Sequence, residues 1–444
     1  MNQEQALQDN FDLKKYDRPL LFLPNEITLL IFSFLGQLDK VNAARVSRVW
    51  CDAIYSPSLW HEAMLYNVKG FKNNILNRLS QVEFLEARAS GISDEEVRLL
   101  VIGPAGKTLK VLDLSVGPQL TNKCLIYIGY HCVNLEKLFL EGCNQITDIQ
   151  PLEMLVDRLK TIVLSYNENL SNAVFWNLSS FGDRITKLDL DGCPQISDAG
   201  IEHLAAHLHG LRYLAIDGQG INDAPVISIF EHCTDLVLFS MSFCDLTDVF
   251  LDGLIRNLCP SLRYLRLRKG AAFTEIGFCR LFEHLTLRGH SFVSLDLSEC
   301  TNVTNIALES LNQPQLRRLN LDWCWNVNDS NILEILKRSP KIEELFITGC
   351  NDVTCESLVG EKIASLKILN LFSCRMVERT IICGISKSNP SLYIVDYYGE
   401  VYKDGKKIGL MDQVFIKEEK VDSQERWGLL NVGSYLRFYR GNSV

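Results

Sequence analysis

The sequence lacks any apolar run long enough to cross a membrane. One of its longest runs, from Ile27 to Leu35, is interrupted by Thr28 and Ser33 and falls well short of the roughly 20 residues that span a bilayer. Residues 1–18 are polar and mixed in charge, without the basic start and apolar middle of a secretory signal. We therefore expect no transmembrane helix, no membrane partner, and residence in the cytoplasm, the nucleus or both.

The chain also has no excess of positive charge. The chain has 45 basic and 54 acidic side chains and a net charge of -9, which opposes generic binding to phosphates. Nucleic acid is therefore not an expected partner.

Catalytic motifs are missing as well, since the sequence has neither a glycine-rich phosphate loop nor a nucleophile elbow. His203 and His207 have the spacing of a zinc pair, but Leu204 stands where the usual glutamate would follow the first histidine. The sequence predicts a protein that is not an enzyme and has no metal and no cofactor.

Cysteine, by contrast, is abundant. Fifteen cysteines in a long chain with no export signal indicate reduced thiols rather than a disulfide framework, and the odd count agrees.

A motif of the form Leu-x-x-Leu-x-Leu recurs along most of the chain. Its thirteen starts are about 26 residues apart on average, and every template position is apolar. The starts are Leu79, Leu109, Leu135, Leu159, Ile185, Leu211, Leu236, Leu262, Phe292, Leu316, Ile342, Leu366 and Leu392. Such a motif is typical of a strand in a repeated unit, with the leucines facing the core.

A small polar residue follows eight of the thirteen strands at a fixed distance. Eight residues after the start stands Asn167 in one repeat and a cysteine in seven others, namely Cys143, Cys193, Cys244, Cys300, Cys324, Cys350 and Cys374. We predict that these side chains turn inward and donate a hydrogen bond to the backbone. Because successive cysteines belong to different coils and lack histidine partners, a zinc site is not expected.

Each repeat continues with a helix signal. Thr121, Thr147, Ser197 and Thr247 precede amphipathic stretches and are predicted N-caps. Units of strand, turn and helix must stack to bury their apolar edges, which predicts an α/β horseshoe solenoid with its strands on the concave face. Residues 79–399 here resemble the cysteine-containing class of leucine-rich repeats. Two steps, from Leu79 and from Leu262, are 30 residues long, and the second predicts a longer convex helix rather than a protruding loop.

A short helical module precedes the repeats. Leu23-Pro24-Asn25-Glu26-Ile27 opens a helix with an apolar stripe, and a second stripe runs from Val46 to Ile54 after Asp39, the predicted cap of its helix. Arg45-Val46-Ser47-Arg48-x-Trp50 and Leu59-Trp60 complete a pattern that resembles an F-box over residues 20–65.

The resemblance implies docking on the Skp adaptor, and through it on a cullin/RING ubiquitin ligase. By resemblance, the contacting residues are Leu23, Pro24, Glu26, Ile27, Ile31, Leu38, Trp50, Leu59 and Trp60. Trp50 and Trp60 fit internal packing equally well. The combination resembles the F-box/leucine-rich-repeat proteins, which implies a substrate receptor of an SCF ubiquitin ligase. A scaffold that binds without causing degradation is the alternative.

The expected division of the chain has five parts: a polar segment at 1–19, the F-box at 20–65, a linker or amino-terminal cap at 66–78, the repeats at 79–399, and a cap hairpin with a tail at 400–444. Asp404-Gly405 marks the turn of that hairpin. Because the chain ends Gly441-Asn442-Ser443-Val444, a prenyl anchor of the kind some relatives carry is not expected.

The concave face is the predicted site for the substrate protein. Residues beside the buried leucines project from it, and aromatic side chains lie there among carboxylates. The candidates are Arg266, Arg268, Lys269, Asp296, Glu299, Asn320, Asp322, Trp323, Phe346, Asn370 and Phe372. Together with Asp189, Asp191 and Asp217, they favour a basic substrate segment first, and an acidic or phosphorylated one held by Arg266, Arg268 and Lys269 second. The tail after Glu400 is the alternative recognition element. The other alternative is that these residues form a solvated sheet face without a binding role.

Overall fold

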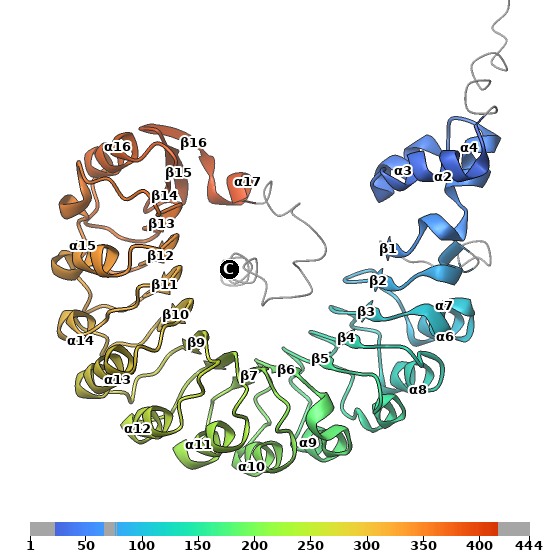
Figure 1. The fold of residues 1–444 in the computed structure, drawn as a ribbon, viewed down its shortest axis with the longest axis horizontal. Coiled ribbons are helices and arrows are strands. Elements are labelled where there is room, and N and C mark those ends of the chain that lie inside the picture. Colours follow the sequence, from blue (N-terminus) through green and yellow to red (C-terminus); the bar gives the residue numbers. More distant parts are fainter. Residues whose placement is uncertain (1–22, 66–75, 77, 416–444) are drawn as a thin grey trace, which may run out of the picture. The chain divides into compact units, whose positions relative to one another are not determined.

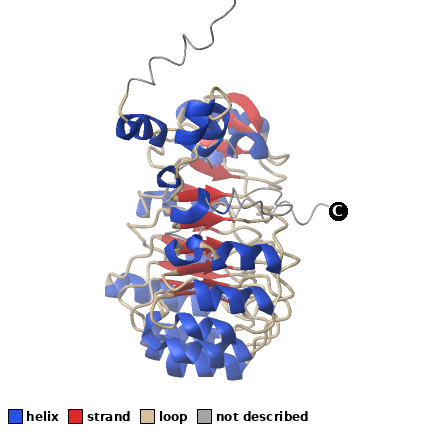
Figure 2. Cartoon of the chain, turned by 90° about the vertical axis from the view of Figure 1, so that its right-hand side faces the viewer, coloured by secondary structure: helices blue, strands red, loops and turns tan. Residues whose placement is uncertain are grey.

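The computed structural model describes residues 23–65, 76 and 78–415. These residues form two compact units that divide between Asp217 and Gly218, and each unit is considered by itself. Within each unit the strands line one side and the helices the other (Figures 1 and 2).

The first unit begins with short helices and continues as a parallel sheet. Its helices are α2 (Asn25–Ser33), α3 (Gln37–Ala43), α4 (Arg48–Ile54), α6 (Asp94–Ile102), α7 (Pro104–Thr108), α8 (Asn122–His131), α9 (Ala173–Leu178) and α10 (Asp198–His207), with 3-10 turns at Pro57–Leu59, Leu79–Gln81, Gln150–Leu155 and Ser179–Arg184. Its strands, neighbours in chain order, are β1 (Glu62–Met64), β2 (Phe84–Glu86), β3 (Val111–Asp113), β4 (Lys137–Phe139), β5 (Thr161–Val163), β6 (Lys187–Leu190) and β7 (Tyr213–Asp217).

The second unit repeats the same strand, turn and helix order. Its helices are α11 (Asp223–His232), α12 (Asp248–Arg256), α13 (Glu275–Arg288), α14 (Asn305–Glu309), α15 (Asp329–Arg338), α16 (Arg379–Ser388) and α17 (Met411–Phe415), with a 3-10 turn at Glu356–Leu358. Its strands are β8 (Leu238–Ser242), β9 (Tyr264–Leu267), β10 (Ser294–Asp296), β11 (Arg318–Asn320), β12 (Glu344–Phe346), β13 (Ile368–Asn370), β14 (Tyr393–Val395), β15 (Glu400–Lys403) and β16 (Lys406–Leu410). β8 to β14 are parallel where their pairing is described, and β14, β15 and β16 pair in antiparallel fashion.

The repeat template is confirmed in the core. The middle leucines of the motif, such as Leu112, Leu265 and Leu319, are at most 2% exposed, and each pairs in register with its equivalent on a neighbouring strand. Each repeat therefore buries its apolar edge only by stacking on its neighbours.

The inward cysteines are also confirmed. The Cys324 thiol donates to the carbonyl of Leu297 at 3.2 Å, the Cys374 thiol donates to that of Ile347 at 2.9 Å, and the Asn167 amide does the same toward Leu140. All fifteen cysteines are free thiols, and burial raises the pKa of Cys193 and Cys244 to about 12. These side chains are hydrogen-bonding core residues. Within the described residues, no group of three or more His, Cys, Asp or Glu is placed to hold a metal.

The predicted register was wrong at both ends of the repeats. Leu79 lies in a 3-10 turn, and β2 aligns Leu85 with Leu112. The motif of that coil therefore starts at Val82, which is 27 rather than 30 residues before Leu109. A still earlier strand, β1, lies inside the segment assigned to the F-box. At the other end Ile394, and not Val395, pairs with Leu369. A one-residue slip of this kind sends a side chain to the opposite face of a sheet.

The slip at β14 creates a second, smaller core on the inner face. Val395 packs there with Val401, Met411 and Phe415, against the partly buried Phe372. The predicted hairpin is present as β15 and β16, with Asp404 and Gly405 at φ 50° and 70° in its turn. The hairpin and α17 therefore cover the inner face at the end of the sheet.

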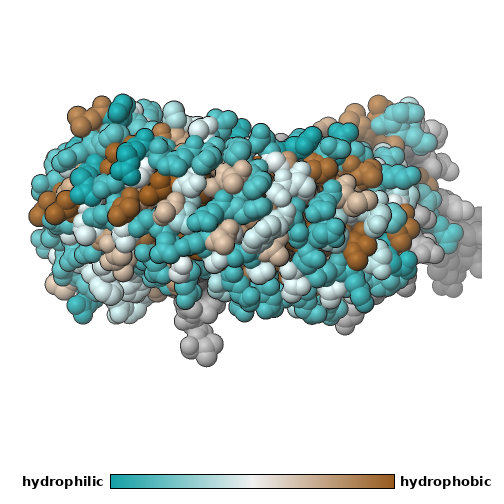
Figure 3. Space-filling view, turned by 90° about the horizontal axis from the view of Figure 1, so that it is seen from below, coloured by the Kyte–Doolittle hydropathy of each residue, from teal (hydrophilic) through white to brown (hydrophobic). Residues whose placement is uncertain are grey.

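The long step after Leu262 forms the predicted long outer helix, since α13 has 14 residues. Among the described residues, no helix is both long and apolar enough to span a bilayer. In the view of Figure 3, the surface is mainly hydrophilic with separate hydrophobic areas.

Two of the four predicted N-caps are confirmed. Thr121 accepts the backbone N–H of Lys123, and Thr247 that of Val249. Ser197 stands at an N-cap position but makes no capping bond to its own helix. The residues after Thr147 begin a 3-10 turn only at Gln150. The predicted Asp39 cap is also wrong, because α4 begins at Arg48 and its N-cap is Ser47, whose hydroxyl accepts the N–H of Trp50.

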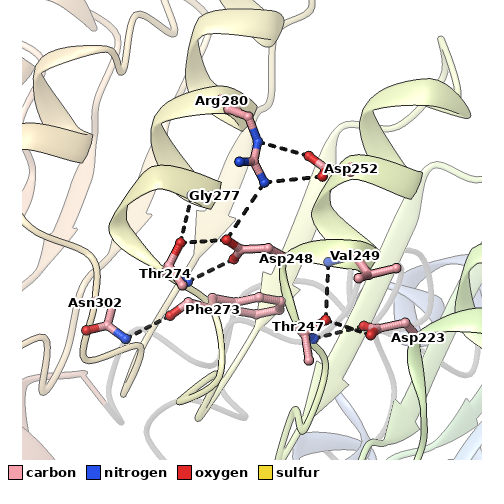
Figure 4. Close-up of polar contacts among 10 residues, drawn as sticks. All are labelled: Asp223, Thr247, Asp248, Val249, Asp252, Phe273, Thr274, Gly277, Arg280 and Asn302. Atoms are coloured by element: carbon pink, nitrogen blue, oxygen red, sulfur yellow. Dashed lines mark hydrogen bonds and ion pairs between the residues drawn. The ribbon is translucent and has the colours of Figure 1, made fainter.

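The N-cap threonines are linked from coil to coil by acidic residues. Asp248, at the start of α12, accepts both the backbone N–H and the hydroxyl of Thr274, the N-cap of α13, at 2.8 and 2.5 Å (Figure 4). Asp223 makes the same pair of bonds to Thr247. Gly277 leaves the room for this contact, since a Cβ there would lie 2.2 Å from Asp248 Oδ1. These bonds orient each helix against the preceding one.

Candidate partner-binding surfaces

The amino-terminal helices have a small interior of their own. Phe32 meets Trp50 edge to face, with ring centroids 5.3 Å apart. The Trp60 indole N–H donates to the carbonyl of Ile54 at 2.7 Å, and its ring stacks on Tyr55. The inward residues of α2 are Thr28 and Phe32, so the predicted stripe that contains Ile27 and Ile31 faces outward.

The outward faces of these helices carry a large apolar surface. Eight large apolar side chains, which we call the F-box apolar surface, are between 37% and 81% exposed: Leu23, Ile27, Leu30, Ile31, Phe34, Leu38, Val46 and Val49. An exposed apolar concentration of this kind marks an interaction site on a soluble protein.

The predicted docking residues divide into two groups. Leu23, Pro24, Glu26, Ile27, Ile31 and Leu38 are exposed. Trp50 is partly buried, and Leu59 and Trp60 are each only 7% exposed. For Leu59 and Trp60 the expectation of direct contact is corrected, because their side chains pack inside the chain and support the surface from behind.

Four residues of this surface were not among the predicted contacts: Leu30, Phe34, Val46 and Val49. Two of them could have been found from the sequence, because Leu30 and Phe34 share the apolar helical stripe of Ile27 and Ile31.

Gln37 joins the helical module to the sheet. Its side-chain amide donates to the carbonyl of Met64 at 2.7 Å and accepts the N–H of Met64 at 2.8 Å. The amide therefore bonds β1 as a neighbouring strand would. Lys40 adds a bond from its ammonium to the carbonyl of Leu59 at 3.0 Å. The apolar surface is thus held against the first coil.

Several polar residues predicted to bind substrate have a structural role instead. Asp296, Asn320 and Asn370 each accept, through Oδ1, the backbone N–H two residues later, and they are at most 4% exposed. Asp189 does the same for Asp191 in the first unit. These are Asx turns that end the strands. Asp191 and Asp217 are also mostly buried.

The charged candidates of the second unit pair with one another. Arg266 Nε lies 3.2 Å from Asp296 Oδ2, and Arg268 lies 3.1 Å from Glu299. Lys269 is 3.7 Å from Glu299 and lies over the ring of Phe243. Each of these cations has a carboxylate partner in the next coil. The charges at these positions therefore no longer favour either a basic or an acidic substrate segment.

Asp322 is buried at 7% exposure and accepts the backbone N–H of Thr348 at 2.6 Å. Burial raises its pKa to about 7, against the hydrogen bond from Thr348. The folded protein therefore holds a proton that the unfolded chain releases above pH ~4, so this group lowers stability as the pH rises from ~4 to ~7.

We expect Asp322→Asn, which keeps the acceptor for Thr348, to stabilise the protein by about 2 kcal/mol at pH 8 and by little near pH 4.5. Thermal unfolding at both pH values measures this. Asp352→Asn, at an exposed carboxylate, is the matched control. An Asp322→Asn effect that does not change with pH would contradict the assignment.

The aromatic candidates differ in how exposed they are. Phe372 packs into the small core under the hairpin, so it is corrected to an internal contact. Phe346 is partly exposed, and Trp323 is 37% exposed. Trp323 is therefore the predicted aromatic with the clearest access to a partner.

Comparison with known proteins agrees with this architecture. Residues 20–65 match the F-box-like family model. DNA repair protein rhp7 of Schizosaccharomyces pombe is 25% identical over 356 residues, which cover 65% of this chain and 62% of the relative. F-box/LRR-repeat protein 4 of Bos taurus is 24% identical over 216 residues, or 47% of this chain and 30% of the relative. Matches to both relatives thus cover less than two thirds of the relatives' length.

A solved structure shares the fold. The crystal structure of the Rad7 and Elc1 complex in yeast matches with a TM-score of 0.50 at 18% identity, covering 80% of this chain and 95% of that chain. The chain thus carries an F-box-like domain followed by a leucine-rich-repeat solenoid.

Proposed function

We propose that the chain is the substrate-recognition subunit of an SCF ubiquitin ligase, without catalytic activity of its own. Its F-box would dock on the Skp adaptor and so on a cullin/RING ligase, while the repeats hold a target protein for ubiquitylation and proteasomal degradation. The observation that carries the proposal is the F-box apolar surface, where Phe34 is 81% and Leu38 is 75% exposed. So much apolar area in water is stabilised by a partner.

The contribution of such a subunit is proximity. Holding a lysine of the target near a charged ubiquitin carrier replaces a bimolecular encounter by an effectively intramolecular one. The proposal places the chain in the cytoplasm, the nucleus or both. The alternative is a scaffold that binds the adaptor and a partner without causing degradation.

One experiment separates the two functions. Proteins bound to the wild-type chain and to a Pro24→Ala/Ile27→Asp variant are compared by quantitative mass spectrometry, with and without inhibition of neddylation. For a degradative receptor, we expect the adaptor and cullin to be lost from the variant. We also expect at least one bound protein to accumulate on the wild-type chain under inhibition.

A scaffold would lose the adaptor in the variant, but inhibition would raise no partner. Retention of the adaptor by the variant would remove the docking assignment. Because Rad7 is crystallised with Elc1, Elc1 is tested beside the Skp adaptor in purified form.

A further inference from the structure

One turn position in the repeats of the second unit has an unusual backbone. The residue seven after each motif start has a positive φ in six consecutive repeats: Phe243, Lys269, Glu299, Trp323, Gly349 and Ser373, with φ between 49° and 69°. Glycine adopts this left-handed conformation freely, whereas a side chain there costs about 1–2 kcal/mol. Trp323, at φ 59°, therefore carries this backbone cost.

Trp323 is held in a defined position. Its indole lies on the backbone of Gly349, where an added Cβ would be 2.3 Å from Cε3 of the indole. Trp325, two residues later on the same turn, is 57% exposed. A rigid tryptophan beside a second exposed one is the kind of anchor that dominates binding energy at protein interfaces.

The same row of turns ends in two tyrosines. The residue at this turn position donates its N–H to the carbonyl just before the same position in the next coil: Gly349 donates to Phe372, and Ser373 donates to Tyr397. Tyr398 therefore occupies in the last coil the position that Trp323 occupies in an earlier one. Tyr397 and Tyr398 meet edge to face with centroids 4.9 Å apart, and Tyr398 is 77% exposed.

We call the exposed Trp323, Trp325, Met376, Tyr397 and Tyr398 the turn patch. From Trp323 to Tyr398 it crosses three strand spacings, or roughly 14 Å, which is about four residues of an extended chain. Its composition of Trp, Tyr and Met is that of a protein interface core.

Charge selects the kind of partner. Arg375 is exposed on the turn between the two aromatic ends, and no described carboxylate lies within ion-pair distance of it. Glu378, three residues after Arg375, and Asp352, on the turn of the preceding coil, are exposed carboxylates, which disfavour a strongly acidic segment. The patch therefore suits one carboxylate placed beside a large apolar group.

We propose that the turn patch binds an extended segment of a partner protein through one large apolar side chain, held by Trp323 and Trp325, and one carboxylate paired with Arg375. The proposal rests on the proposed function in one respect, namely that the segment belongs to the captured target. It moves recognition from the inner strand face to the adjoining turns.

The test uses dye-labelled twelve-residue peptides of serine and glycine that carry one phenylalanine and, two residues later, aspartate, asparagine or lysine. Binding to the full chain is followed by fluorescence anisotropy. We expect the aspartate peptide to bind best, by about tenfold over the lysine peptide. Arg375→Glu is expected to reverse this order.

The decisive variant is Trp323→Gly. Because glycine relieves the backbone cost, thermal stability is expected to be unchanged or higher, while aspartate-peptide binding falls about tenfold. Trp176→Ala, at an exposed tryptophan on α9, is the control that leaves binding intact.

Three outcomes would overturn the proposal: equal binding of the three peptides, binding that survives Trp323→Gly, or self-association of the chain through the patch. All variants are also assayed for the Skp adaptor. If a variant loses peptide binding but still binds the adaptor, the result bears on the turn patch alone. If the wild type does not bind the adaptor, the proposed function is contradicted and the turn-patch proposal is not.

Discussion

Ile27→Asp is expected to lower affinity for the Skp adaptor by more than about a hundredfold while the repeats stay folded. Ile27 is 42% exposed in the free chain, so a carboxylate there is hydrated and costs little folding energy. In a complex it would be buried without a partner in an apolar interface, which is expensive. Titration with purified adaptor measures the affinity, and circular dichroism of the free variant shows whether the repeats stay folded.

Val249→Asp is the matched control, because Val249 is an exposed apolar residue on α12, outside the F-box apolar surface. It should bind the adaptor as the wild type does. If Ile27→Asp bound equally well, the docking assignment of α2 would be wrong. A second substitution, Leu38→Asp at a 75% exposed position on α3, tests the same surface independently.

Asp248→Ala is expected to destabilise the second unit by about 2 kcal/mol. The substitution removes both bonds to Thr274 and the 3.7 Å ion pair with Arg280. It also removes a favourable negative charge at the amino-terminal end of α12. Urea unfolding gives the free energy, and hydrogen exchange should show faster exchange at the start of α13.

Asp252→Ala is the control in the same cluster. Asp252 contacts Arg280 at 3.0 Å on the exposed side of the helices (Figure 4), and an exposed ion pair contributes under about 1 kcal/mol. The loss of stability in Asp248→Asn should lie between those of Asp248→Ala and Asp252→Ala, because asparagine can still accept the N–H of Thr274. Equal effects of Asp248→Ala and Asp252→Ala would mean that the link between coils contributes nothing beyond surface charge.

The regular part of the fold could be read from periodicity. A strand motif that recurs about every 26 residues, followed by an inward cysteine, leaves one way to bury the leucines, namely stacking. Cys324 and Asn167 turn inward and donate to backbone carbonyls as predicted, and the structure adds that these carbonyls belong to the preceding coil. At the ends the pattern was ambiguous, because Leu79, Val82 and Leu85 are all apolar and spaced by three. Only the pairing of Leu85 with Leu112 on the next strand showed that the motif of this coil starts at Val82.

The candidate sites could be predicted only in part. The stripe containing Ile27 and Ile31 was visible, but a helical stripe alone does not say whether it faces a core or solvent. Likewise, Asp296 and Asn320 alternate with buried leucines as exposed residues would, yet each closes an Asx turn. Sequence spacing carries no information on which backbone N–H such a side chain will accept.

The sequence by itself determined the repeat, the inward spine and the presence of an F-box-like module, because these follow from local periods that any stacked arrangement must satisfy. Only the tertiary structure decided which polar residues remain available, since Arg266 and Arg268 find their carboxylates one strand away. It also decided that Phe372 is covered and Trp323 is exposed. The physical reason is that hydrogen bonds and ion pairs between coils join residues about 25 positions apart, whose mutual geometry exists only after stacking.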